Sequence, residues 1–340
     1  MKILFVLSSN KFSGAENVVC QIAHFLQQQA QFYYCSPFGD IETSLLDKNV
    51  VFKGVKKLNV KNLKRIIKEI RPDVIHANDV KASFISMLAC KKIPLICHLH
   101  NNEQIIRRLS IKSLCFLLAC KKAKKAIFVS NTNYQSYYFK KAIKQKAIVL
   151  RNVISSDDII NKANVDIYDE NYDVAFLGRL GEPKNPLRMV KIMCDYVDQT
   201  GGNCVVIGDG NLKQECVQYV ADKGCLSHIN FMGFQKNPYK ILKNCKSMIM
   251  SSVYEGTPMC ALEAYCLGVP IVSTKTDLAE MIIGGKTGYV YDQDEDAVKY
   301  LKEVTSNREF YKNNCLEYFK KINNEKEYAN KMLQIYKEAK

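Results

Sequence analysis

Two glutamates separated by seven residues stand beside a predicted helix start in the segment SSVYEGTPMCALEA. An apolar run ahead of Glu255 predicts a strand, and the aliphatic spacing after Pro258 predicts a helix that carries Glu263. Proline suits the first helical position, because it has no amide hydrogen to leave without an acceptor. The amides of Met259 and Cys260 are then free at the positive end of the helix, where anions bind. We expect both carboxylates to face one site and to bind hydroxyl groups or cations there; a capping role for Glu255 alone is the alternative.

A second group of candidate residues follows the first predicted strand of the second half. Arg179 and Lys184 lie in the strand-end loop GRLGEPKN, where a guanidinium and an ammonium would suit a diphosphate. Gly14 opens a predicted helix in the first half, so a phosphate could approach the backbone amides there. Gly178 and Gly208 are further candidate ligand-binding positions in strand-end loops. A pair of solvated surface cations, and glycines needed only for turns, are the alternatives.

Short apolar runs alternate with helical patterns throughout the chain, which predicts α/β architecture with parallel sheets covered on both faces. The expected strands are 2–7, 73–77, 93–99, 126–129, 147–150, 173–177, 203–207, 229–231, 247–250, 270–273 and 288–291. The expected helices include 15–28, 62–70, 186–197 and 259–267. The series restarts after the polar stretch 155–171, which is interpreted as a linker between two doubly wound domains, 1–160 and 161–324. In such domains ligands bind at the carboxyl ends of the strands.

Composition excludes several classes of protein. The longest apolar run, Leu114–Cys120, is far shorter than the roughly 20 residues of a membrane-spanning helix. The start MKILFVLSSN is too short in apolar residues for a secretory signal, so we expect a cytoplasmic protein. The 14 cysteines then stay reduced, and because no C-x-x-C pair occurs they are interpreted as small core residues rather than metal ligands.

The positive charge is concentrated in the first half of the chain. The net charge is +15 overall, and the first 150 residues carry 25 basic and 8 acidic residues. Such asymmetry predicts an anionic partner, either nucleic acid or a phospholipid surface. The segment 104–125 combines apolar residues with cations, which is typical of a helix that lies on a membrane, the alternative being a helix packed on the sheet. Its cations are Arg107, Arg108, Lys112, Lys121, Lys122, Lys124 and Lys125.

The segment EGTPMCALE resembles the E-x7-E motif of the family 4 retaining glycosyltransferases. The following GVPIVST, the earlier GRL and KN, the IGDG and the opening SGAE are similar to further motifs of that family. The resemblance implies the GT-B fold, in which two Rossmann-like domains face each other across a cleft. It also implies that the last helix, 325–340, returns to the first domain. Two departures from the common pattern are Ser13 in place of a glycine and Thr257-Pro258 in place of Phe-Gly.

The resemblance also implies roles for individual residues. Glu263 would hold the ribose hydroxyls of a nucleotide-sugar donor, and Glu255 the hydroxyls of its sugar. Arg179 and Lys184 would neutralise the diphosphate, with Gly14 approaching it from the first domain. His100 corresponds to a histidine that faces the donor sugar. His98 lies on the same side of the strand, so the spacing leaves open which of the two histidines faces the cleft.

We therefore expect a retaining glycosyltransferase that moves a sugar, from a UDP-sugar by preference, to a lipid-linked or polysaccharide acceptor. The basic first half places the reaction at the cytoplasmic face of the membrane. No metal or other cofactor is expected, because no D-x-D follows a suitable strand, and Asp292-x-Asp294, just past strand 288–291, is expected to cap the helix that follows. The alternatives are an inverting GT-B transferase or an epimerase-like enzyme. A nucleic-acid-binding protein is disfavoured because no recognition module is apparent.

Overall fold

The computed structural model describes residues 1–90, 92–100, 104–165, 168 and 170–340. The chain divides into two compact units, unit 1 with residues 1–153 and 324–340, and unit 2 with residues 154–323. The division lies at 153/154 rather than at 160. Part of the polar stretch expected to be a linker is a helix of unit 2, α7 (Ser156–Ala163). It forms because Ile159 and Ala163, four residues apart, are buried on one helical face.

Unit 1 is built on a seven-stranded sheet with strand order β3-β2-β1-β4-β5-β6-β7, and every neighbouring pair is parallel. Its strands are β1 (Lys2–Val6), β2 (Gln31–Cys35), β3 (Val51–Phe52), β4 (Val74–Ala77), β5 (Leu95–Leu99), β6 (Lys125–Phe128) and β7 (Ala147–Val149). Its helices are α1 (Gly14–Phe25), α2 (Ile41–Ser44), α3 (Val60–Ile70), α4 (Val80–Ala89), α5 (Ile111–Lys122), α6 (Asn131–Ser136) and α14 (Glu325–Ala339). Two short 3₁₀ turns, η1 (Gln104–Ile106) and η2 (Lys140–Ile143), complete the unit.

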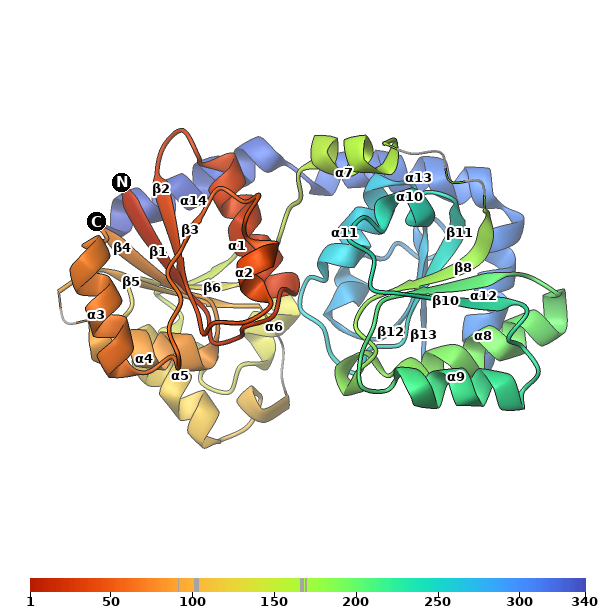
Figure 1. Ribbon diagram of the computed structural model, residues 1–340, viewed down its shortest axis with the longest axis horizontal. Coiled ribbons are helices and arrows are strands. Elements are labelled where there is room, and N and C mark those ends of the chain that lie inside the picture. Colours follow the sequence, from red (N-terminus) through yellow and green to blue (C-terminus); the bar gives the residue numbers. More distant parts are fainter. Residues whose placement is uncertain (91, 101–103, 166–167, 169) are drawn as a thin grey trace. The chain divides into compact units, whose positions relative to one another are not determined.

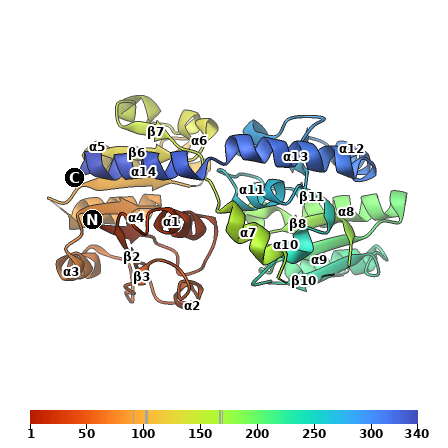
Figure 2. The ribbon, with the colours of Figure 1, turned by 90° about the horizontal axis from the view of Figure 1, so that it is seen from above.

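Helices cover both faces of this sheet. In Figure 1, α3, α4 and α5 lie below the strands and pack side by side, while α14 runs along the upper side, where it contacts α1. Figure 2 shows α14 extended alongside the sheet over most of its length. The buried residues of α14 repeat at helical spacing and are Tyr328, Met332, Ile335, Tyr336 and Ala339.

Unit 2 repeats the design with a six-stranded parallel sheet of order β10-β9-β8-β11-β12-β13. Its strands are β8 (Tyr172–Leu177), β9 (Cys204–Ile207), β10 (Ile229–Gly233), β11 (Cys245–Met250), β12 (Ile271–Thr274) and β13 (Gly288–Tyr291). Besides α7, its helices are α8 (Pro186–Thr200), α9 (Lys213–Asp222), α10 (Tyr239–Leu242), α11 (Met259–Cys266), α12 (Asp294–Ser306) and α13 (Arg308–Ile322), with 3₁₀ turns η3 (Glu182–Lys184) and η4 (Asp277–Met281). In Figure 1, α8 and α9 lie on one side of the sheet and α10 and α11 on the other.

The expected α/β class with two doubly wound parallel sheets is thus correct. Two strands of unit 1 were not predicted. The strand β2 has the sequence QFYYC and lacks the β-branched residues that marked the others, and β3 has only two residues. The segment 104–125 is not one helix: η1 and α5 are separate, and Ser110 caps the start of α5 by accepting a hydrogen bond from the amide of Ser113.

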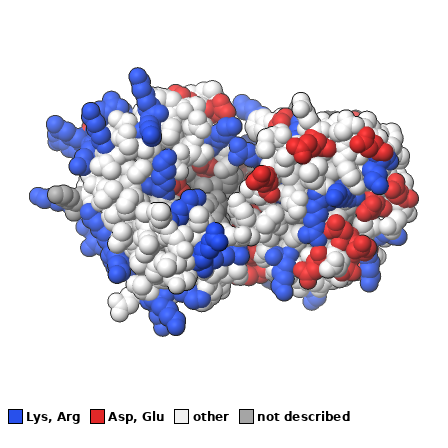
Figure 3. Space-filling model, turned by 90° about the horizontal axis from the view of Figure 1, so that it is seen from below, with Lys and Arg blue, Asp and Glu red and all other residues white. Residues whose placement is uncertain are grey.

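Unit 1 holds 30 basic and 11 acidic residues, whereas unit 2 holds 19 and 23. Figure 3 shows the consequence: Lys and Arg side chains spread over unit 1, with Asp and Glu gathered on unit 2. Within the described ranges, no helix is both long and apolar enough to span a bilayer.

Candidate functional site

The candidate residues of unit 2 gather at the carboxyl ends of β8 and β11, two strands that pair directly. Arg179 and Lys184 follow β8, and Glu255 follows β11. The carboxyl ends of parallel strands meet at one edge of a sheet, so residues 71 positions apart come into contact here. The Lys184 ammonium donates a short hydrogen bond to Oε1 of Glu255 and forms an ion pair with it.

Glu255 is held by a second donor from its own loop. The hydroxyl of Ser252 donates to the same carboxylate oxygen at 2.5 Å. The side chains of Lys184 and Glu255 are only 23% and 11% exposed, so the pair is partly withdrawn from water. Burial by itself would lower the pKa of Lys184, but the Glu255 carboxylate more than offsets this and raises it. Lys184 is therefore fully charged at neutral pH, as a phosphate ligand requires.

The loop that carries Lys184 is fastened to the end of β11 by hydrogen bonds that sequence reasoning missed. The Ser251 hydroxyl donates to the carbonyl oxygens of Lys184 and Asn185, at 2.8 and 2.9 Å. The amide of Val253 donates to the carbonyl of Pro183. Asn185 has a φ of +47°, a conformation that asparagine tolerates better than most residues, and it joins η3 to α8. These contacts set the position of Lys184 over Glu255.

The helix N-terminus beside this pair differs in one detail from the prediction. Pro258 is the N-cap residue and Met259 the first residue of α11, because Pro258 keeps an extended backbone with ψ of 128°. The amide of Ala261 donates to the carbonyl of Pro258. The amides of Met259 and Cys260 occupy the first two helical positions, which have no acceptor within the helix. Burial raises the pKa of the Cys260 thiol to about 12, against the influence of the nearby Lys184 ammonium, so the thiol stays neutral.

Glu263 lies one turn into α11 and is only 7% exposed. Its Oε1 accepts a hydrogen bond of 3.2 Å from the hydroxyl of Tyr239 on α10, a partner that the sequence did not indicate. Burial raises the pKa of Glu263 to about 7, while the Tyr239 hydrogen bond and the charge of Lys162 act in the opposite direction. A buried carboxylate with spare lone pairs is suited to accepting hydrogen bonds from vicinal hydroxyls.

Arg179 is brought to the same edge of the sheet but does not join the Lys184–Glu255 pair. Its side chain is exposed, and within the part of the chain that the structure describes its guanidinium forms no ion pair. An exposed guanidinium at the carboxyl end of a strand remains able to bind an oxyanion bidentately.

Gly178 and Gly208 touch each other through their backbones. Gly208 has a φ of +144°, and a Cβ atom added to it would stand 1.9 Å from the carbonyl oxygen of Gly178. The amide of Gly178 donates to the carbonyl of Ile207, which draws the ends of β8 and β9 together. These two glycines therefore shape the loops of the site by close backbone packing.

We expect Gly208→Ala to lower the free energy of unfolding by about 2 kcal/mol or more, because it adds a backbone clash to an unfavourable φ. Urea denaturation of the two proteins measures the difference. Gly14→Ala is the matched control, since a Cβ atom there would meet no atom of the chain within 4 Å. A Gly208→Ala protein as stable as wild type would contradict this packing.

In unit 1, Gly14 is the first residue of α1, and Ser13 is its N-cap. The amide and hydroxyl of Ser13 both donate to Oε2 of Glu16, at 3.0 and 2.6 Å, which forms a capping box. Burial raises the pKa of Glu16, and the Ser13 hydrogen bonds act against this. The loop is therefore held by its own side chains, and the serine that departs from the family pattern has a capping function.

The structure distinguishes the two histidines that the spacing left open. His98 is fully buried, whereas His100, directly after β5, retains 7% of its surface. His100 is thus the one at the carboxyl edge of the sheet, where Nε2 lies 3.0 Å from Oδ1 of Asn78. Burial lowers the pKa of His100 to about 3, so its imidazole is neutral at physiological pH.

The predicted cations of segment 104–125 fall into two sets. Lys122 and Lys125 have structural partners: the Lys122 ammonium donates to the carbonyls of Met87 and Cys90 at the end of α4, and Lys125 pairs with Glu338 at 3.5 Å. Both ammonium groups keep their charge and Lys122 is exposed, so the assignment of these two residues to a docking surface stays a prediction. The other five cations are exposed, as Lys122 is: Arg107, Arg108, Lys112, Lys121 and Lys124.

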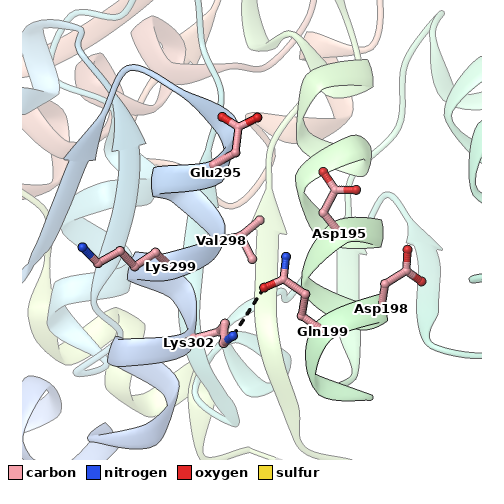
Figure 4. Close-up of a pocket in the computed structure, with 7 residues that line it drawn as sticks. All are labelled: Asp195, Asp198, Gln199, Glu295, Val298, Lys299 and Lys302. Carbon is pink, nitrogen blue, oxygen red and sulfur yellow. Dashed lines mark hydrogen bonds between the residues drawn. The ribbon is translucent and has the colours of Figure 1, made fainter.

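Asp294 does not cap α12 but is its first residue, and it accepts a hydrogen bond of 2.6 Å from Nε of Arg188. Further along the same two helices, a surface hollow of about 430 Å³ lies between α8 and α12 (Figure 4). Its polar residues include Asp195 and Asp198 on one side and Glu295 on the other, and Lys302 donates to Gln199 across it. None of the predicted site residues lines it.

Two family models match this chain. The model of the glycosyl transferases group 1 matches residues 157–332, which is just over half of the chain. The model of Glycosyltransferase Family 4 matches residues 12–156. The two matches correspond closely to unit 2 and to the main part of unit 1.

Individual relatives agree with these matches. The chain is 24% identical to the lipopolysaccharide 1,6-galactosyltransferase of Salmonella typhimurium, over 95% of this chain and 98% of that protein. It is 26% identical to the N-acetylgalactosamine-N,N'-diacetylbacillosaminyl-diphospho-undecaprenol 4-alpha-N-acetylgalactosaminyltransferase of Campylobacter jejuni, over 50% of this chain and 48% of that protein. Among solved structures, Anabaena Alr3699/HepE in complex with UDP-glucose superposes with a TM-score of 0.82 over 99% of this chain and 100% of that one, at 19% identity. This likeness shows the GT-B fold.

Proposed function

This chain belongs to the glycosyl transferases group 1 and is a glycosyltransferase, and we propose a specific reaction for it. It transfers a sugar from a UDP-sugar to a lipid-linked or polysaccharide acceptor, with retention of the anomeric configuration, at the cytoplasmic face of a membrane. The observation that carries the proposal is the cluster of Lys184, Glu255, Glu263 and the open start of α11 at one edge of the unit 2 sheet.

The cluster suits a nucleotide-sugar because it offers a different partner to each part of that molecule. Lys184, Arg179 and the first amides of α11 provide positive charge for a diphosphate leaving group, whose negative charge grows in the transition state. Glu263 provides an acceptor for the ribose hydroxyls. Glu255 provides an acceptor for hydroxyls of the transferred sugar. The UDP-glucose held by the Anabaena protein supports uridine as the nucleoside of the donor.

Retention is proposed without a covalent intermediate. Double displacement would need a carboxylate nucleophile on the face of the sugar opposite the leaving group. Glu255 is engaged by Lys184 and Ser252, which favours hydroxyl binding over nucleophilic attack. The acceptor hydroxyl would then attack from the same face that the diphosphate leaves, and the departing phosphate oxygen would take its proton.

The nature of the acceptor is supported by the two relatives. One acts on lipopolysaccharide and the other on a diphospho-undecaprenol-linked sugar, according to their names. A lipid-linked acceptor also accounts for a strongly basic unit 1, because its membrane carries anionic headgroups.

The donor is tested by thermal denaturation of the protein with UDP-, GDP- and ADP-sugars. A ligand that binds only the folded protein raises its apparent stability, by about 2.7 kcal/mol at a hundredfold excess over Kd. We expect the UDP-sugars to give the largest shifts. Turnover with the best donor and a lipid-linked acceptor, followed by anomer analysis of the product, then tests retention. An inverted product would support the alternative inverting GT-B transferase.

We expect turnover to continue after chelation of divalent cations, because the protein's own cations and helix amides face the leaving group. The measurement compares initial rates with EDTA and with added Mg²⁺ or Mn²⁺. Complete loss of activity with EDTA that Mn²⁺ restores would overturn the metal-free reaction.

Membrane docking is proposed for an apolar stripe on unit 1, formed by Leu109, Ile111, Leu114 and Leu118. The three residues on α5 repeat at helical spacing, and Ile111 and Leu118 are 82% and 50% exposed. Exposed cations flank the stripe. An apolar face bordered by cations is typical of helices that lie in the headgroup region of anionic membranes.

We expect the triple variant Arg108→Gln, Lys121→Gln, Lys124→Gln to bind anionic vesicles more weakly, by roughly 1 kcal/mol for each cation removed. Binding of the wild-type protein should fall steeply between low and moderate salt, because screening shortens to about 10 Å at 0.1 M. Vesicle sedimentation measures both effects. Glutamine keeps the helix propensity close to that of the original residues.

The matched control replaces three exposed cations of α3, Lys61, Lys64 and Lys68, by glutamine, which removes the same charge away from the stripe. Its binding should decrease less. Ile111→Gln together with Leu118→Gln should weaken binding while the net charge stays unchanged. Equal binding of the wild-type protein to neutral and anionic vesicles would contradict the proposal.

A further inference from the structure

A row of polar side chains crosses the interior of unit 1 where apolar residues would be expected. His76 on β4 and His98 on β5 are fully buried, and Asn78 and His100 continue the same faces two residues further along each strand. Buried polar groups cost free energy unless they are hydrogen-bonded. The pattern of these hydrogen bonds therefore shows which proton each ring carries.

Asn78 determines the proton of His100. Its Nδ2 donates to the backbone carbonyl of His76 at 2.9 Å, so the amide can be oriented in only one way. Its Oδ1 then faces Nε2 of His100 at 3.0 Å and can only accept. Nε2 of His100 must therefore carry the hydrogen. Because burial keeps the ring neutral, with a pKa of about 3, its Nδ1 has a free lone pair.

Nδ1 of His100 is buried and has no hydrogen-bond partner within the described part of the chain. A hydroxyl group can donate a hydrogen bond to such an unpaired acceptor nitrogen. The other face of the histidine is supported by His98, whose ring centroid lies 3.9 Å from that of His100.

His98 is connected to Tyr336 on the C-terminal helix α14 by hydrogen bonds that pass through His76. The Tyr336 hydroxyl lies 2.8 Å from Nδ1 of His76, and Nε2 of His76 lies 3.2 Å from Nδ1 of His98. If the tyrosine donates, each of these contacts has one donor and one acceptor, and only the N–H of His98 Nε2 stays without a partner. The opposite direction would leave both the tyrosine hydrogen and Nε2 of His98 unsatisfied, so we assign the first.

We propose that Asn78 is a positioning residue that holds His100 as its Nε2–H tautomer, so that Nδ1 is available to accept a hydrogen bond from a hydroxyl group of a substrate. The inference rests on the proposed function for the identity of that hydroxyl. The tautomer itself depends only on contacts within unit 1. The hydrogen-bonded chain of Tyr336, His76 and His98 supports the His100 ring, because His98 packs against that ring.

The tautomer is tested without any substitution by nitrogen NMR of protein labelled in its five histidines. A protonated and an unprotonated imidazole nitrogen resonate far apart. We expect the His100 signals at pH 7 to show hydrogen on Nε2 and none on Nδ1. The His100→Gln protein identifies those signals by their loss. A wild-type His100 with hydrogen on Nδ1, or a charged ring, would overturn the proposal.

Three variants test what the tautomer does. Asn78→Leu removes the acceptor, and we expect mixed tautomers of His100 with kcat lowered about tenfold or more and donor KM within about twofold. Asn78→Asp restores an acceptor oxygen and should restore the single tautomer. Tyr336→Phe should change the signals of His76 and His98 but not the tautomer of His100. An unchanged His100 tautomer in Asn78→Leu would sink the positioning role.

The proposed function and the positioning role of Asn78 can be refuted independently of each other. If the wild-type protein turns over no UDP-sugar, the proposed function fails, while the NMR result still decides the tautomer. If turnover is found but Asn78→Leu keeps the wild-type kcat, the inference about Asn78 fails and the proposed function stands.

Discussion

Replacing Arg179 and Lys184 together by alanine is expected to lower kcat by about 10²-fold or more, the loss typical for removal of preorganised charge from a transition state. The diphosphate gains negative charge as the glycosidic bond breaks, so these cations act most strongly at that point. Steady-state kinetics with the UDP-sugar donor measures the effect. Lys191→Ala is the control, because it removes one charge from the exposed side of α8. Activity within twofold of wild type in the double variant would contradict the diphosphate assignment.

The structure adds a consequence for stability. Without Lys184, the Glu255 carboxylate is left partly buried with Ser252 as its one side-chain donor among the described residues, which we expect to destabilise the fold by about 1–3 kcal/mol. Adding Glu255→Gln to Lys184→Ala should recover most of this stability without recovering kcat. Glu255→Gln alone should lower kcat, since the proposed partner of Glu255 is the reacting sugar. Recovery of kcat in the combined variant would show that Lys184 acts only by neutralising Glu255.

Donor binding is expected to weaken as the pH falls through the pKa of Glu263, which burial raises to about 7. The ionised carboxylate is the form that accepts two hydrogen bonds from ribose hydroxyls. For a single ionisation at that pKa, the donor KM should rise about tenfold between pH 8 and pH 6. Glu263→Gln should raise the donor KM and remove this pH dependence. Tyr239→Phe removes a hydrogen bond that lowers the pKa, so it should shift the dependence to higher pH.

The same carboxylate makes stability depend on pH. Its pKa is about 7 in the folded protein and near 4.5 when unfolded, so the folded state binds more protons between these values. The contribution of Glu263 is therefore most favourable below pH 4.5 and is lost as the pH rises through 7. We expect Glu263→Gln to be more stable than wild type at pH 8, by up to about 3 kcal/mol, with little difference near pH 4.5. Urea denaturation at both pH values measures this, and a destabilised variant at pH 8 would contradict the burial of the charge.

Much of the architecture was predictable because buried helices and strands have patterns of apolar residues that can be recognised within a short stretch of sequence. The strand β9 lies between two other strands of its sheet, so it is apolar along its whole length and stands out in the sequence. The start of α11 was predictable to within one residue, since proline and the aliphatic spacing act locally. The strands β2 and β3, at one end of the unit 1 sheet, were missed because they lack the β-branched runs on which the strand predictions relied.

The types of residue in the candidate site, and their order along the chain, follow from the sequence alone. Their partners do not, because a hydrogen bond between distant residues depends on strand order and loop geometry. Only the folded chain pairs Lys184 with Glu255, places Tyr239 on Glu263 and brings Tyr336 to His76 across 260 residues. It also gives Lys122 the backbone carbonyls of Met87 and Cys90 as partners, and Lys125 the carboxylate of Glu338, none of which the spacing of the basic segment indicates. Local sequence patterns indicate which residues become buried. The tertiary structure decides which partners these residues contact once they are buried.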